Sequence, residues 1–363
     1  METLAYKPHL ADVLARLRSL YQRQAGDRAF ARMDVPLPAL DDFRRHYAAG
    51  YCEEPDVESR AAFWDAICRQ RQAIDDDSVP SAYLSEMDQG LYAGLFGGKV
   101  QFMAHPENGW ISTMVAPLLN DWSEFDGLRF DRSHPWFVRY LHQLDRFVER
   151  SAGKFALSHF ILIDGLNFVF ELVGATRAYL SLDEHPDRVR QAIDFAFALN
   201  AEIHQTFFDR VPLVGGGTAS NMVQWIPGRI VSESVDPFHM TSVGYFEQWG
   251  REPVEKILAR FDGGVVHIHG NGRHLLEAVA TIRGLKAIYL GDDKGFASAF
   301  DVLDALRVRV GEMPLVVQVP CGKFRDSLER GRLAGGVLYH VSDVPDIDTA
   351  NRLMDRVRAH RTA

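Results

Sequence analysis

From residue 135 onward, helical and β-rich segments alternate along the chain, and this alternation leaves few folds open. Right-handed crossovers between alternating strands and helices produce a parallel sheet. The number of units predicts an α/β protein, namely a closed (β/α)8 TIM barrel with an N-terminal helical extension, and an open doubly wound sheet is the alternative. The expected helices are Trp136–Ser151, Phe168–Leu182, Pro186–Arg210 and Ser242–Phe261, and the expected strands are Lys154–Leu162, Pro212–Val214, Val265–His269, Lys286–Leu290, Pro314–Val319 and Gly336–Val341.

The first 75 residues lack the alternation of strands and helices and are expected to form an N-terminal helical cap. Apolar residues between Leu10 and Ala25 recur at the spacing of an amphipathic helix, and residues 55–72 show a similar pattern. We find no internal repeat and no long linker farther along. Residues 76–363 are therefore expected to form the barrel as a single structural unit.

Composition and charge narrow the expected partners. The 363 residues include 40 Lys and Arg against 49 Asp and Glu, and no basic run is interleaved with aromatics, so nucleic acid is not expected to bind. Met1–Gln24 has no apolar signal-peptide core and no later stretch has the length of a membrane span, so we expect a cytoplasmic protein without a membrane partner. Cys52, Cys68 and Cys321 are too few and too scattered for a disulfide framework or a Cys-rich zinc module.

Two histidines, His267 and His269, stand at the end of one expected strand. Side chains two residues apart on a strand point to the same face, so both imidazoles should project together. The carboxyl ends of parallel strands are where barrel active sites form. The pair is therefore a candidate for metal ligation or proton transfer. The alternative is a buried His267 bonded to backbone and an ordinary loop residue at position 269.

The most specific hypothesis for this pair is that it binds a divalent metal such as zinc. His267, His269 and Asp292, at the end of the next expected strand, would supply three ligands and leave a fourth position open. The competing role for Asp292 is capping a helix that begins near Gly295. Further candidates follow other expected strands or lie in loops above them: Asp236 as a catalytic group, and Asn167, Trp225, Asn271, Gln318 and Trp110 as substrate-binding groups, with Asp164 in the same region.

Six segments, taken in their order along the chain, resemble a known family. They are Trp122–Leu128, Phe155–Ser158, Gly165–Gly174, Tyr179–Pro186, His267–Asn271 and Gly284–Ile288. Their order resembles the uroporphyrinogen decarboxylase superfamily, which includes corrinoid- and coenzyme-M-type methyltransferases and is related in fold to cobalamin-independent methionine synthase. The resemblance covers roughly residue 75 to the end and implies one barrel with its pocket at the carboxyl ends of the strands.

The departures from the family pattern bear on the activity that the resemblance implies. Arg23–Arg28 is similar to the decarboxylases' carboxylate-binding motif but has an inserted Asp27, which leaves Arg28 as a candidate substrate ligand. Phe170 stands where the decarboxylases have an active-site Tyr, and Ser342 falls near their late Gly-His-Gly. In the methyltransferase branch, His267 matches a zinc ligand, whereas His269 replaces a Cys.

The resemblance therefore favours a methyltransferase acting on a small polar substrate. The resemblance implies a metal, a corrinoid or folate-like methyl donor and a corrinoid protein as partner, and a homodimer is the default assembly. Two alternatives remain at this stage. One is a decarboxylase of a tetrapyrrole-like polycarboxylate that uses Arg23 and Arg28, and the other is a barrel that binds ligands without catalysis.

Overall fold

Parallel strands form the largest sheet of the computed structural model, which describes residues 3–161 and 165–362. Its six strands run in the order β1-β13-β12-β11-β10-β9, and every neighbouring pair is parallel. Their bounds are β1 Phe30–Met33, β9 Val231–Ser234, β10 Gly264–Ile268, β11 Leu285–Leu290, β12 Leu315–Pro320 and β13 Val337–Ser342. The molecule is thus a mixed α/β protein built on a parallel sheet.

Two smaller sheets accompany the six-stranded one. The first has the order β3-β6-β7-β8, in which β3 Ser81–Tyr83, β6 Ala156–Ser158 and β7 Gly217–Ser220 are parallel and β8 Gln224–Pro227 is antiparallel to β7. The second is antiparallel and consists of β2 Gly50–Cys52, β4 Val100–His105 and β5 Trp110–Val115. In the described part of the chain, the strand ladders keep these sheets separate from the six-stranded one.

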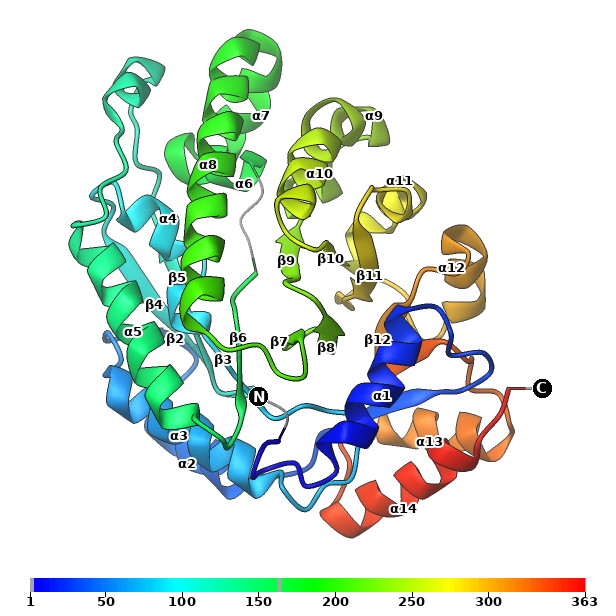
Figure 1. Ribbon diagram of the computed structural model, residues 1–363. Helices are drawn as coiled ribbons and strands as arrows, with labels where there is room; N and C mark the ends of the chain where they lie inside the picture. Colours follow the sequence, from blue (N-terminus) through cyan, green and yellow to red (C-terminus); the bar gives the residue numbers. More distant parts are fainter. Residues whose placement is uncertain (1–2, 162–164, 363) are drawn as a thin grey trace.

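Helices lie around the outside of the molecule, and the strands lie toward its middle (Figure 1). The α-helices are α1 Leu10–Tyr21, α2 Pro38–His46, α3 Val57–Gln70, α4 Gly90–Gly94, α5 Pro135–Ser151, α6 Gly165–Val173, α7 Ala175–Glu184, α8 Pro186–Arg210, α9 Val243–Tyr245, α10 Arg251–Arg260, α11 Leu276–Ala280, α12 Leu303–Val310, α13 Cys321–Glu329 and α14 Ile347–Ala359. Shorter turns are the 3-10 helices η1 Ser85–Met87, η2 Trp122–Gly127, η3 Asp236–Met240 and η5 Gly270–Leu275, and the π-helix η4 Phe246–Gly250. None of the helices in the described ranges combines the length and the apolar composition needed to cross a membrane.

The first 75 residues contain strands that the helical pattern did not reveal. β1 is an edge strand of the six-stranded sheet, and β2 belongs to the antiparallel sheet. Helix α1 packs its apolar face against side chains of the sheet strands, including Val265 and Leu338. The N-terminal segment thus contributes to the main sheet as well as supplying helices, and a domain boundary near residue 75 stays a prediction.

The middle of the chain departs from the sequence prediction in three places. The helix predicted over Phe168–Leu182 is divided at Gly174 into α6 and α7. Pro212–Val214 is not a strand, and Val214 forms only an isolated bridge to Gly217, where β7 begins. The segment predicted as a loop between Trp225 and Phe238 contains β8, β9 and the start of η3. Leu162 and Asp164 lie outside the described residues, so the end of the strand predicted to reach Leu162 is not compared.

Two adjacent carboxylates, Asp76 and Asp77, fix β1 and the N-terminal segment in place. Asp76 is fully buried, lies 3.0 Å from Lys7 Nζ and 3.0 Å from an Arg71 nitrogen, and accepts the Met33 N–H at 2.9 Å. Asp77 accepts the N–H of Ala31 at 3.0 Å and donates its own N–H to the Ala31 carbonyl at 2.9 Å. These bonds satisfy backbone groups of an edge strand that would otherwise lack partners.

Replacing Asp76 with Asn should lower the free energy of unfolding by about 3 kcal/mol at pH 7, because the charges of Lys7 and Arg71 would stay buried without their partner. Burial by itself would raise the pKa of Asp76, but Lys7 and Arg71 outweigh it and lower this pKa. The stabilisation is therefore present above the unfolded-state pKa of about 3.9 and is lost as the pH falls through the lower folded-state value.

Urea unfolding at several pH values checks this expectation. The difference between wild type and Asp76→Asn should shrink as the pH drops below about 4. Asp355→Asn is the matched control, because the Asp355 side chain is 79% exposed and its stability change should stay within about 0.5 kcal/mol. Equal effects of the two substitutions at pH 7 would contradict the anchoring role of Asp76.

Candidate functional site

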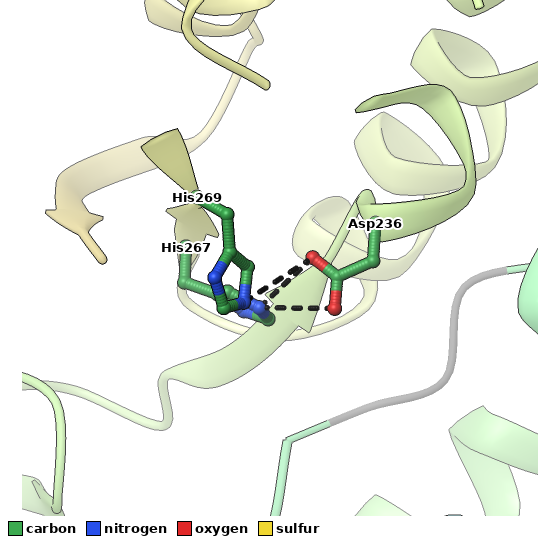
Figure 2. A group of neighbouring side chains, drawn as sticks. All are labelled: Asp236, His267 and His269. Atoms are coloured by element: carbon green, nitrogen blue, oxygen red, sulfur yellow. Dashed lines mark hydrogen bonds and ion pairs between the residues drawn. The ribbon is translucent and has the colours of Figure 1, made fainter. Parts of the chain in front are cut away.

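Two neighbouring parallel strands bring three polar side chains together. β9 pairs with β10 so that Ser234 lies opposite His267. His269 follows β10 directly, and Asp236 begins η3 shortly after the end of β9. Because the carboxyl ends of parallel strands meet at one edge of the sheet, Asp236 faces both imidazoles (Figure 2).

The distances within this group suit a shared ligand. His267 Nε2 lies 3.0 Å from Asp236 Oδ1 and 3.2 Å from Oδ2. His269 Nε2 lies 4.0 Å from Asp236 Oδ1. One donor atom from each of Asp236, His267 and His269 lies within 4.8 Å of the other two. The group can therefore hold a single metal ion.

A second carboxylate orients His269. Asp293 Oδ1 lies 3.0 Å from His269 Nδ1, and Asp293 Oδ2 accepts the Asn271 N–H at 3.2 Å. A carboxylate on one ring nitrogen fixes the tautomer and leaves the lone pair on the other nitrogen. Asp293 thereby directs the Nε2 lone pair of His269 toward Asp236.

The electrostatics of the group follow from its burial and its opposite charges. His267 is 7% exposed, and burial disfavours its protonated form, but the Asp236 carboxylate outweighs burial and raises the pKa of His267. Burial would likewise raise the pKa of Asp236, and the facing imidazoles lower it instead. The pair favours imidazolium with carboxylate, so a metal ion that binds here must displace a proton from His267.

A third imidazole, that of His239, also faces Asp236. His239 Nδ1 is 3.6 Å from Asp236 Oδ1, and its ring centre is 5.7 Å from that of His269. Burial lowers the pKa of His239 to about 4, so the ring is neutral at pH 7. A Cβ atom at Gly272 would come within 2.1 Å of the ring, so glycine is required at this position to accommodate His239.

Asp88, in the turn between η1 and α4, adds a further carboxylate. Burial raises the pKa of Asp88 to about 7, the charge of His267 lowers it and that of Asp236 raises it. Asp88 therefore interacts electrostatically with both side chains. A carboxyl group that titrates near pH 7 is suited to accept or donate a proton during a reaction.

The structure brings two of the predicted substrate-binding residues to this group. Asn167 Nδ2, on α6, donates to Ser234 Oγ at 3.4 Å, and Ser234 Oγ accepts the Asp236 N–H at 3.3 Å. Asn271 contacts the group through its N–H bond to Asp293. Both amides thus lie beside the carboxylates that hold the imidazoles.

Asp292 does not join the two histidines. Its Oδ1 lies 3.0 Å from an Arg273 nitrogen and accepts the Ala299 N–H at 2.7 Å. Adjacent residues at a strand end point in different directions, so Asp293 turns toward His269 and Asp292 turns away. The structure therefore replaces Asp292 with Asp236 in the set of candidate metal ligands.

Three other predicted residues lie elsewhere. Gln318 is exposed on β12, two strands from β10, and donates to Tyr289 Oη at 2.6 Å. Trp225 is fully buried and donates to the Val214 carbonyl at 2.7 Å, so it is a core residue. Trp110 on β5 packs on Tyr83 with ring centres 4.9 Å apart.

Arg28 is at the wrong end of the sheet to serve this site. It precedes β1, and its guanidinium donates to the carbonyls of Ala25 and Gln24. Since β1 runs parallel to the rest of the sheet, the residue before it lies at the amino ends, whereas the histidines lie at the carboxyl ends. Arg28 instead stabilises its own turn.

The sequence prediction missed His239, and it did not choose Asp293 or Asp88. His239 follows Asp236 by three residues in a short 3-10 turn, a spacing that places both side chains on one face and could have marked them. Asp293 was passed over in favour of its neighbour. Asp88 comes from a loop distant in sequence, and no local pattern connects it with the histidines.

The residues present fit a divalent metal of the zinc type. Catalytic zinc sites use three protein ligands from His and carboxylate and keep one position open. The Asp236 and His269 side chains are 37% and 40% exposed, so the group is accessible to a ligand. The carboxylate on the outer nitrogen of His269 is the usual support for a metal-binding imidazole.

The fold and the site define an α/β protein with a polar, histidine-containing group at the carboxyl ends of its parallel strands. A methyltransferase from Methanosarcina mazei has a similar structure, with a TM-score of 0.60 and 14% sequence identity over 95% of this chain and 98% of that chain. At that identity, the likeness establishes a shared fold. No protein-family model and no curated protein sequence matches this chain.

Replacing Asp236 with Asn should lower the pKa of His267, because the carboxylate is what counters the effect of burial on this imidazole. The stabilising part of this pairing is present below the unfolded His pKa of about 6.5 and is lost as the pH rises through the raised folded value. NMR titration of the metal-free protein measures the change directly. Asp292→Asn is the control and should leave the pKa of His267 unaltered, so equal shifts in both variants would contradict the pairing.

Proposed function

We propose that this protein is a metal-assisted methyltransferase acting on a small polar substrate. The observation that carries the proposal is the convergence of His267, His269 and Asp236, with His269 held by Asp293. The fold shared with the Methanosarcina mazei methyltransferase supports the same reaction class. The proposal has four further parts: membership of the uroporphyrinogen decarboxylase superfamily, a corrinoid- or folate-linked methyl donor, a corrinoid-protein partner and a homodimer.

We also propose that the strands complete a (β/α)8 barrel. In chain order, β3 and β6 would stand between β1 and β9. The bonds between Asp77 and Ala31 connect β1 with the segment before β3. On the other side, Thr218 of β7 accepts the Ile230 N–H at 3.0 Å, directly before β9. Both connections support closure of the ring.

The chain's own residues have distinct parts in the proposed reaction. His267, His269 and Asp236 would hold the metal, which when bound supplies Lewis acidity to the reacting atom of the substrate. Asp293 keeps the Nε2 lone pair of His269 directed inward. Asp88 is the group that can exchange a proton with the substrate near pH 7. His239 is neutral and adds no charge that would repel the metal.

The decarboxylase alternative loses its structural motivation. It required Arg23 and Arg28 to hold carboxylates of a polycarboxylate substrate. Arg28 bonds its own turn at the amino ends of the strands, and Arg23 lies in a separate turn directly after α1. The non-catalytic alternative finds no support in a group whose ligand atoms converge and remain accessible.

Elemental analysis after zinc loading tests the metal centre. About one zinc per chain is expected in the wild type. Asp236→Asn, His267→Ala and His269→Ala should each weaken zinc binding at least tenfold, and Asp293→Asn should weaken it about tenfold through loss of orientation. Asp292→Asn is the matched control and should bind zinc like the wild type.

Transfer of an isotopically labelled methyl group from methylcobalamin or methyltetrahydrofolate then tests the reaction. Activity should follow zinc content across the variants. Zinc binding in the wild type without transfer from either donor would remove the methyltransferase assignment and keep the metal centre. Absence of zinc binding in the wild type would remove both.

A further inference from the structure

A group of acidic side chains adjoins the metal-ligand candidates and is not used by them. It consists of Asp88, Glu171 on α6 and Glu233 on β9, whose charges all act on the hydroxyl of Tyr92 on α4, the helix that packs against α6. We call these four residues the acidic subsite. Glu233 is 2% exposed and Tyr92 is fully buried. Asp88 and Glu171 are half-buried, and carboxyl groups that are largely shielded from water need compensation by hydrogen bonds or positive charge.

The backbone explains how these residues come together. Asn167 and Glu171 are four residues apart on α6 and so lie on one face of the helix. Asn167 reaches Ser234 at the end of β9, beside Asp236. One turn farther along, Glu171 accepts a hydrogen bond from the backbone of Ala93 in α4, next to Tyr92. The α6 face therefore runs from the metal-ligand candidates to the acidic subsite.

Two buried oxygen atoms of the acidic subsite have no donor. Within residues 3–161 and 165–362, neither Tyr92 Oη nor Glu171 Oε2 has a hydrogen-bond partner. The charges of Glu233, Glu171 and Asp88 all act on the Tyr92 hydroxyl, which places it among the carboxyl groups. A buried phenol and a buried carboxyl oxygen without donors form a set that a ligand with several N–H donors and a positive charge would satisfy.

Basic side chains near this region are already paired. Arg60 forms an ion pair with Glu86, and both side chains are almost fully buried. Arg273 pairs with Asp292 at 3.0 Å. Neither guanidinium is free to compensate Asp88 or Glu171. The charge of His267 acts on Asp88, whereas the groups that act on the Tyr92 hydroxyl are three carboxyl groups and Tyr140. The part of the subsite around Tyr92 thus favours a cationic ligand over an anionic one.

We infer that Asp88, Tyr92, Glu171 and Glu233 bind the ammonium group of the substrate beside the His267, His269 and Asp236 group. Asp88, whose charge interacts with both His267 and Asp236, connects the two halves of the site. A primary or secondary ammonium ion offers the N–H donors that the unpartnered oxygens need, whereas a quaternary ammonium ion offers none. The inference rests on the proposed function only in treating the neighbouring group as the reacting centre.

Titration calorimetry with methylammonium chloride tests the acidic subsite. The zinc-loaded wild type should bind methylammonium more tightly than tetramethylammonium, and neutral tert-butanol should not compete. Glu171→Gln and Asp88→Asn should each raise the Kd for methylammonium about tenfold or more, because each removes a charge-assisted hydrogen bond. Tyr92→Phe should raise it about fivefold.

Controls distinguish a loss of methylammonium binding at the subsite from misfolding and from loss of the metal. Glu184→Gln changes an exposed carboxylate at the end of α7 and should leave the Kd unchanged. Thermal melting identifies any variant that fails to fold, and Tyr92→Phe then provides the test, because it removes only the hydroxyl. Zinc content should stay near one per chain in Glu171→Gln and Tyr92→Phe.

Each remaining outcome decides one proposal. No methylammonium binding, or equal competition by potassium chloride, would overturn the ammonium subsite while leaving zinc binding and methyl transfer intact. Methylammonium binding that weakens in Glu171→Gln would uphold the ammonium subsite even if no methyl transfer is detected. An unaltered Kd in all three subsite variants would also overturn it.

Discussion

The parallel pairing of β9 with β10 is the contact on which the candidate site depends. It sets Ser234 opposite His267, so that the chain leaving β9 places Asp236 in front of both imidazoles. A shift of one residue in this register would turn His267 and His269 toward the other face of the sheet. Because every residue of β10 is buried on both faces, burial alone does not select the register, and the specific packing of its side chains and the His267–Asp236 pair oppose a slip.

Carboxylates in this protein fall into two electrostatic classes. Asp76 and Asp77 are buried against Lys7, Arg16 and Arg71, and they hold the N-terminal segment to the sheet. Asp88 and Glu171 are half-buried and form no ion pair with Lys or Arg in the described part of the chain, and partial removal from water raises their pKa values. The first class stabilises the fold. The second class favours binding of a positive charge beside the histidines. Carboxyl groups with such raised pKa values are common at functional sites.

The sequence predicted the sheet best where strands are long and apolar. Helix α8 has the predicted bounds, and β10 to β13 agree within one or two residues, because β-branched runs between helices are distinctive. β1 was missed since its four residues include Arg32, whose side chain pairs with Asp34, and so lack a continuous apolar run. β7 begins at a glycine, and β8 follows a short turn, so their strand character comes from pairing rather than from composition.

The site was predictable only to the extent that strand ends reveal it. His267 and His269 share one strand end, and Asp236 follows another. Because functional sites form at the carboxyl ends of parallel strands, the sequence predicted all three as site residues. The choice between Asp292 and Asp293 depends on which way the chain turns after β11, and the turn is fixed by Arg273 and Ala299, which bind Asp292. The charge of Glu171 acts on Tyr92 because α4 and α6 pack together, a long-range contact that leaves no trace in local sequence. Strand-end residues can thus be proposed from sequence, whereas the charge environment that would select a substrate emerges from helix packing.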